Sequence, residues 1–216
     1  MADVTFYFPS TGAAAHDCGY SDYWTNTTGA AHLPLLSSKG TSAMAGRNAW
    51  HATGQNYCLA GQWVSAAMAA RSWTPYDTFD YSMIFRDQNY STTTFITHLS
   101  IRIFNAAGDT EVATLFEGEV NASAWIATYQ SRHCDGVALT GSGDMPENGH
   151  FVVEVGGYAT YAGAYAGQAI FGEGTSTALL LNDTQTNTDL YSWISFTYGE
   201  APATGYINEV VVVFES

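Results

Sequence analysis

The sequence is poor in charge, and above all in positive charge. Only 12% of its 216 residues are charged, and six Lys and Arg stand against 20 Asp and Glu, which gives a formal net charge of −14. A surface that binds nucleic acid or an anionic membrane needs clustered basic side chains, and the sequence contains no such cluster. We therefore expect neither as a partner, whereas cations or a basic partner surface suit the excess of carboxylates.

Features typical of several other protein classes are also missing. Cys18, Cys58 and Cys134 are odd in number and lack CxxC spacing, so we expect three reduced thiols without a disulfide framework or standard zinc site. No apolar run approaches the ~20 residues of a membrane span, and the first residues show no signal-peptide pattern. Phosphate-loop, GxSxG and HExxH motifs do not occur. We expect a protein that folds in the cytoplasm where it is made and has no cofactor.

Alternating apolar residues dominate the remaining pattern and predict many short strands. Phe79, Tyr81, Met83 and Phe85 alternate with Asp80, Ser82, Ile84 and Arg86. Turn residues 106–109 join a strand at 95–103 to another at 112–116. Further strands are predicted at 4–8, 33–36, 151–155, 165–171, 191–198 and 210–214. The fold class expected is all-β: one domain over residues 1–216, an antiparallel β-sandwich that is jelly-roll-like. An up-and-down barrel is the alternative.

Two stretches are harder to interpret. Residues 25–56 are rich in Thr, Ser, Gly and Ala, and beyond the strand at 33–36 we expect loops. Within Tyr57–Trp73, the run Ala66–Ala70 has high helix propensity, whereas Trp63 and Val64 suit a strand. Propensity alone favours a short helix there.

Three glutamates are the strongest candidates for enzyme chemistry. Glycoside hydrolysis requires two carboxylates that flank an aromatic-lined cleft. Glu117 and Glu119 are two residues apart and so share one face of a strand, and Glu154 lies within the strand pattern around Val153 and Val155. The tyrosines that follow could stack on sugars: Tyr158, Tyr161 and Tyr165. The alternative is that all three glutamates are solvent-facing strand residues.

Two other groups of residues could bind a metal. Asp183, Gln185, Asn187 and Asp189 offer oxygen ligands at every second position, as calcium loops do, but the central Gly and distal Glu of the helical calcium loop are missing. A structural calcium at Asp183, Asn187 and Asp189 therefore competes with a plain polar loop. The motifs His16-Asp17-Cys18 and His133-Cys134-Asp135 could converge, but ordinary loops explain them equally well.

The six tryptophans suggest a binding role. Trp193 has a strand pattern and is expected in the core, whereas Trp24, Trp50 and Trp73 are predicted in loops. Loop tryptophans could form a platform for glycans or a contact between subunits.

Several segments together resemble a known group of proteins. They are Thr5–Phe8, Trp24–Lys39, Leu99–Phe104, His150–Tyr158 and Asp189–Phe196. Their order is similar to poorly characterised proteins encoded among the capsid and tail genes of tailed bacteriophages and prophages, in which a VVEIGY strand and a closing D-L-x-x-W-I-x-F strand recur. The resemblance covers most of residues 4–198 and implies that Trp63-Val64-Ser65 opens a strand and loop, against the helix interpretation.

The resemblance implies a non-enzymatic virion structural protein that makes contacts with other virion proteins, such as the major capsid or tail protein. A capsid decoration or minor head protein that bridges neighbouring subunits is expected, with self-association by symmetric contacts. Residues 199–216 extend beyond the family pattern and are a candidate added strand, with contact residues Tyr206, Ile207, Val210, Val212 and Phe214. The alternatives are a carbohydrate-binding module for host recognition and a glycosidase.

Overall fold

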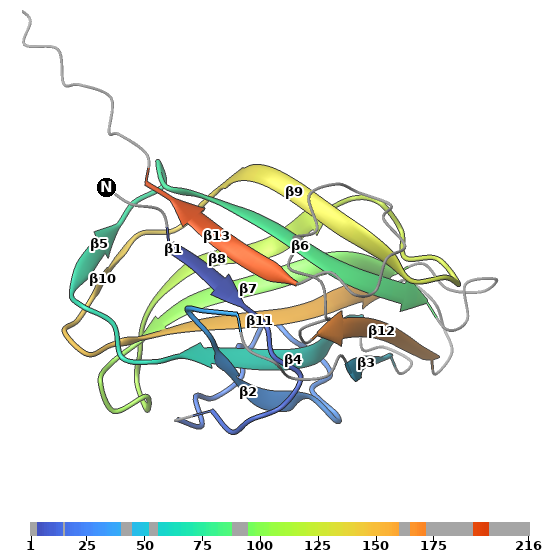
Figure 1. The fold of residues 1–216 in the computed structure, drawn as a ribbon, viewed down its shortest axis with the longest axis horizontal. Coiled ribbons are helices and arrows are strands. Elements are labelled where there is room, and N and C mark those ends of the chain that lie inside the picture. Colours follow the sequence, from blue (N-terminus) through green and yellow to red (C-terminus); the bar gives the residue numbers. More distant parts are fainter. Residues whose placement is uncertain are drawn as a thin grey trace, which may run out of the picture.

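A computed structural model describes residues 4–14, 16–39, 45–51, 56–87, 95–159, 165–171 and 192–198. Thirteen strands are formed in this part of the chain (Figure 1). Their bounds are β1 Val4–Tyr7, β2 Ala31–Leu35, β3 Ala45–His51, β4 Tyr57–Ser65, β5 Arg71–Trp73, β6 Thr78–Asp87, β7 Phe95–Phe104, β8 Glu111–Asn121, β9 Gln130–Ala138, β10 Gly143–Met145, β11 His150–Ala159, β12 Tyr165–Phe171 and β13 Trp193–Thr197.

Two main sheets face each other. One has the order β2-β4-β11-β7-β8, in which β2 and β4 are parallel and the other pairs antiparallel. The other is organised by the long strand β6, which pairs with β9 along one edge and with β13 and then β12 along the other. Strands β1 and β3 complete that sheet beside β13 and β12. The prediction of an all-β sandwich is confirmed.

The core between the sheets is largely aromatic. Phe151 on β11 meets Phe196 on β13 edge-to-face, with ring centroids 4.6 Å apart. At the other end of the core, Trp125 stacks between Phe85 and Phe95, at 4.5 and 5.1 Å. These rings come from both sheets, so their burial holds the two layers together.

The segment Tyr57–Trp73 forms strand β4, a loop at 66–70 and strand β5, so the helix favoured by the Ala-rich run is wrong. A strand and a loop are present as the alternative has it, but Trp63-Val64-Ser65 ends strand β4 and does not open it. Burial explains this outcome, because β4 is the second strand of the sheet and all its residues from Cys58 to Ser65 are buried. Tertiary burial overrides local propensity here. Among the described residues no helix has the length and apolarity to cross a membrane.

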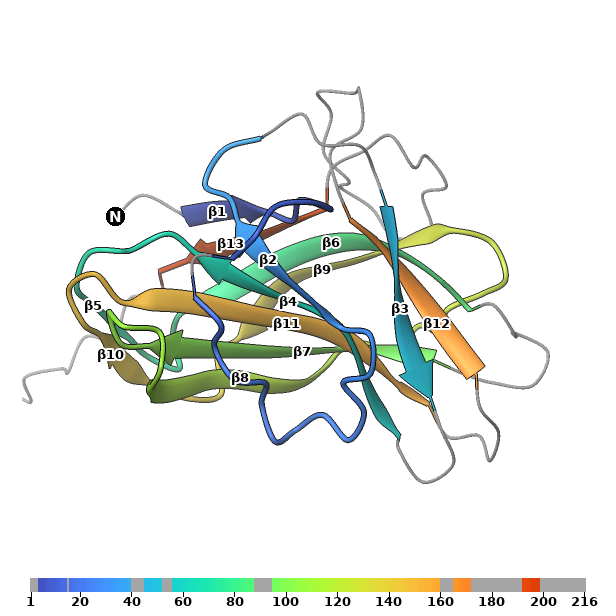
Figure 2. The ribbon, with the colours of Figure 1, turned by 90° about the horizontal axis from the view of Figure 1, so that it is seen from below.

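The outer face of the β2–β8 sheet is covered by an N-terminal strap, which we define as residues 16–26 (Figure 2). Cys18 of the strap packs with Val64, Phe104 and Val152, which point outward from β4, β7 and β11. The strap then runs beside the start of β4, where the backbone N–H groups of Thr25 and Asn26 donate to the Tyr57 carbonyl at 2.9 and 3.0 Å. The strap thus converts an exposed sheet face into a second buried layer.

Candidate functional site: a buried carboxylate beside a tyrosine cluster

A row of polar side chains crosses the sheet beneath the strap. Glu154 on β11 lies opposite Gln62 on β4 and Ser100 on β7, and Ser100 lies opposite Glu117 on β8. Residues in register on neighbouring strands point to the same face. The neighbours of Glu154 along β11, Val153 and Val155, point into the core instead. The strand alternation therefore places the carboxylates on the outer face.

Glu154 is fully buried and receives hydrogen bonds from four groups. Gln62 Nε2 and Trp24 Nε1 donate to it at 2.8 Å each, and the backbone N–H of Ser21 donates to both oxygens at 3.2 and 3.3 Å. Arg102 Nη2 lies 2.6 Å from Oε1. Two of these donors belong to the strap and two to the sheet, so the carboxylate fastens one to the other.

Arg102 is itself buried and is held from several sides. Its Nη2 also donates to the Gly19 carbonyl at 2.7 Å, and its Nη1 forms an ion pair with Glu111 at 3.0 Å. A charge-assisted network of this kind offsets the cost of taking a carboxylate and a guanidinium out of water. Both charges are therefore engaged within the protein.

Glu117 and Glu119 lie on the same face of β8, as predicted, but their surroundings differ. Glu117 is half-buried and accepts hydrogen bonds from the hydroxyls of Ser21 and, at 3.3 Å, of Ser100. Glu119 is exposed and lies opposite His98 on β7. The interpretation of all three glutamates as solvent-facing is wrong for Glu154, because the strap covers it.

The strap and the covered carboxylates limit the chemistry of this site. A general acid or nucleophile must reach the substrate's reacting atoms at about 3 Å, and Glu154 is fully buried with both oxygens hydrogen-bonded to the strap and the sheet. The hydrogen bonds of Glu154 therefore hold the strap on the sheet.

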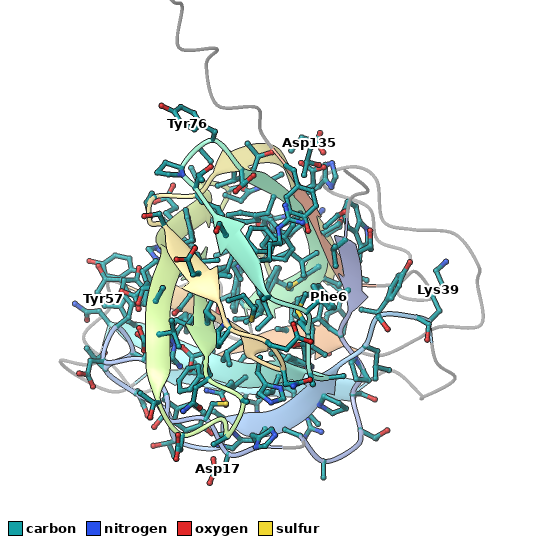
Figure 3. All side chains as sticks on the ribbon, turned by 90° about the vertical axis from the view of Figure 1, so that its left-hand side faces the viewer. Phe6, Asp17, Lys39, Tyr57, Tyr76 and Asp135 are labelled. Atoms are coloured by element: carbon teal, nitrogen blue, oxygen red, sulfur yellow. The ribbon has the colours of Figure 1, made fainter. Side chains whose placement is uncertain are left out.

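A cluster of four aromatic rings adjoins the carboxylate row. Tyr57, the first residue of β4, lies opposite Tyr158 on β11, with ring centroids 4.9 Å apart. Tyr23 of the strap lies 4.7 Å from Tyr57, and His98 lies 5.4 Å from Tyr57 and 5.8 Å from Tyr158. The three tyrosines are half-buried and His98 is buried. Figure 3 shows Tyr57 at the margin of the molecule.

Burial sets the protonation of this cluster. Desolvation lowers the pKa of His98 to about 4, and its Nδ1 is hydrogen-bonded to the Tyr23 hydroxyl. Desolvation also raises the pKa of Tyr23, with smaller contributions from Tyr57, Glu117 and Glu119. Near neutral pH His98 is therefore an uncharged imidazole and Tyr23 a neutral phenol.

The predicted tryptophan platform needs correction. Trp24 is 6% exposed with its indole N–H bound to Glu154, and Trp73 is 2% exposed, 5.2 Å from the Phe151 ring. Neither can serve as an exposed glycan platform, because Trp24 is buried where the strap meets the sheet and Trp73 lies in the core. Trp50 lies in strand β3, rather than in a loop.

Other predicted residues lie outside the described part of the chain. They are the calcium candidates Asp183, Gln185, Asn187 and Asp189, the contact residues Tyr206, Ile207, Val210, Val212 and Phe214, and Tyr161. The calcium site and the C-terminal contact strand therefore stay predictions.

The cysteine and histidine motifs separate in space. The three cysteines are free thiols. His133 pairs with Asp135 at 2.8 Å, and Asp17 of the other motif pairs with His32 at 3.3 Å. Within the described ranges no group of three His, Cys, Asp or Glu side chains could hold a metal ion.

The residues that sequence reasoning missed are the partners of Glu154: Ser21, Gln62 and Arg102. Each is far from Glu154 in the sequence, by 133, 92 and 52 residues. The one available signal was a charged residue, Arg102, within an apolar strand pattern, because such a residue buried in a sheet requires a partner.

No family model and no curated protein matches the sequence. Among solved structures, a CocE/NonD family hydrolase of Staphylococcus aureus is similar with a TM-score of 0.30 and 11% identity, covering 92% of this chain and 34% of that one. A structure of the infectious bursal disease virus Gx strain is similar with a TM-score of 0.22 and 10% identity, covering 79% and 39%. The chain thus spans about a third of the hydrolase. At these scores neither similarity indicates a function.

Proposed function

We propose that this chain is a non-catalytic structural component of a phage particle. The observation that carries the non-catalytic part is Glu154, whose two oxygens are fully occupied by the strap and by Arg102. A group buried and bonded in this way stabilises a fold and is closed to substrate. The phage context rests on the sequence resemblance of residues 4–198.

The architecture suits a mechanical role in a particle. Two sheets share one aromatic core, and the strap adds a second buried layer on the outer face. Such a body changes shape little when it contacts neighbours. We propose a capsid decoration or minor head protein that bridges neighbouring subunits and self-associates symmetrically. A position on the tail is the alternative.

Quantitative mass spectrometry of purified particles tests this function. We expect the chain in a fixed copy number per particle that survives gradient purification and a high-salt wash. Deletion of residues 200–216 should then abolish incorporation, because the apolar sequence Tyr206–Phe214 is the proposed contact strand. Absence of the chain from particles overturns the structural role, and unchanged incorporation of the truncated chain overturns only the role of the C-terminal segment.

A further inference from the structure

We propose that the cluster of Tyr23, Tyr57, His98 and Tyr158, together with the exposed Glu119, is a docking patch for a guanidinium or ammonium side chain of a partner protein. We call it the tyrosine patch. It deepens the proposed structural role and rests on it, since a bridging protein needs a defined contact surface. The partner's chemistry follows from the charges and free groups of the patch.

The geometry indicates that a ligand lies on the patch and not inside it. Centroid distances of 4.7 to 4.9 Å between neighbouring tyrosines mean that the rings are already in contact with one another. No cage remains between them, but each tyrosine is half-buried and so keeps part of its surface open. A planar guanidinium can stack on such a ring surface.

The electrostatics favour a cation. Glu119 is exposed and Asp22 of the strap is exposed, whereas Arg102 on the same sheet face is neutralised by Glu154 and Glu111. His98 is buried and carries no charge near neutral pH. The faces of the tyrosine rings are electron-rich, and adjacent carboxylates add to the attraction of a cation. The formal net charge of −14 acts in the same direction over longer range.

Free polar groups complete the patch. The hydroxyls of Tyr57 and Tyr158 and the carboxylate of Glu119 form no hydrogen bond with any residue in the described ranges. Tyr23, by contrast, is fixed by the bond between its hydroxyl and His98. A guanidinium has five N–H donors, and Glu119 can accept two of them in a fork-to-fork arrangement.

A peptide of alternating Arg and Gly is the probe, and the same peptide with citrulline in place of Arg is its neutral counterpart. Binding is measured by fluorescence anisotropy at low and high salt. We expect the Arg peptide to bind and the citrulline peptide not to. The double variant Tyr57→Ala/Tyr158→Ala should weaken binding by about fivefold or more, and Glu119→Gln should weaken it and flatten the salt dependence.

Matched controls separate this patch from general attraction to an acidic protein. Tyr76→Ala removes a 51% exposed ring and Asp135→Asn an exposed charge elsewhere on the surface (Figure 3). Both should change affinity by less than about twofold, as expected for distant independent sites. Tyr57→Phe keeps the ring and should retain most of the binding. Thermal unfolding of each variant confirms that the fold is intact, and Glu119→Gln alone changes only an exposed side chain.

Three results would overturn the proposal. Equal losses for Asp135→Asn and Glu119→Gln would mean nonspecific attraction, and equal binding of the citrulline peptide would exclude a cation site. Salt-independent binding to a glycan array that is lost in Tyr57→Phe would mean a saccharide site instead. None of these affects the copy number per particle, so failure of the patch and failure of the structural role are distinguishable.

Discussion

Arg102 and Glu154 form an ion pair across strands β7 and β11, with Nη2 and Oε1 2.6 Å apart and side chains 3% and 0% exposed. Taking two charges out of water costs several kcal/mol per ion, and mutual attraction offsets that cost only where further hydrogen bonds complete the pair. Here those bonds come from the strap through Ser21, Trp24 and the Gly19 carbonyl. The pair therefore couples folding of the sheet to docking of the strap.

The first prediction concerns the loss of one charge from this pair. Glu154→Gln should lower the free energy of unfolding by about 3–5 kcal/mol, because it leaves the Arg102 guanidinium without its buried counter-charge. Urea denaturation measures the change. Glu111→Gln is the matched control, since Glu111 pairs with the same guanidinium but is 37% exposed, and it should cost less than about 1 kcal/mol. Similar costs for the two variants would contradict the assigned role of Glu154.

The second prediction concerns Gly156, where the strap lies directly on the sheet. A Cβ at this position would lie 2.1 Å from the Cys58 carbonyl oxygen and 2.6 Å from the Trp24 ring. Gly156→Ala should therefore destabilise the protein by about 1–3 kcal/mol, as overpacking does. At Gly19 a Cβ would meet nothing within 4 Å, so Gly19→Ala is the control. Equal thermal midpoints for the two variants would show that the strap is not packed as described.

The third prediction concerns pH. Burial lowers the pKa of His98 from 6.5 to about 4 in the folded protein, so the unfolded chain binds more protons between these values. The stability contributed by the neutral form is complete above about pH 6.5 and is lost as the pH falls toward 4, by up to about 1.4 kcal/mol per pH unit. Urea unfolding at several pH values should show this slope, and His98→Gln should reduce it. An unchanged slope in the variant would assign the effect to other groups.

The fourth prediction concerns thiol reactivity. Desolvation raises the pKa of Cys58 to about 12 and that of Cys18 to about 11. Since the thiolate is the reactive form, neither should react with a disulfide reagent at pH 8 in the native state, whereas all three thiols should react in denaturant. Cys134, which is half-buried, is expected to react first. Fast reaction of two or more native thiols would contradict the described packing.

The sequence predicts those strands that place apolar side chains in the core at every second position. Phe79, Tyr81, Met83 and Phe85 all enter the core, so strand β6 was visible as alternation. Strands β3, β5, β9 and β10 were missed. Strand β9 contains mostly polar residues with mixed burial and, among the described strands, pairs with β6 alone at the edge of the sheet, so its sequence lacks a clear apolar face.

The candidate site was less predictable, because it depends on contacts between distant segments. The position of Glu154 within an apolar strand was clear from the sequence, but whether its face is open or covered depends on the strap. Trp24 was predicted to be an exposed loop residue for the same reason, because only the docking of the strap on the sheet buries it. Tyr158 was recognised as a possible ligand contact, whereas Tyr23 and Tyr57 join it only through the strap and the β4–β11 register.

Cryo-electron microscopy of the native particle is the decisive experiment for the proposed structural role in a phage particle. We expect this two-sheet sandwich to be traceable as an ordered, symmetric component, with the tyrosine patch against a basic side chain of a neighbour. A particle map that contains no density for this chain, together with a purified protein that is a lone monomer, would overturn the proposed role.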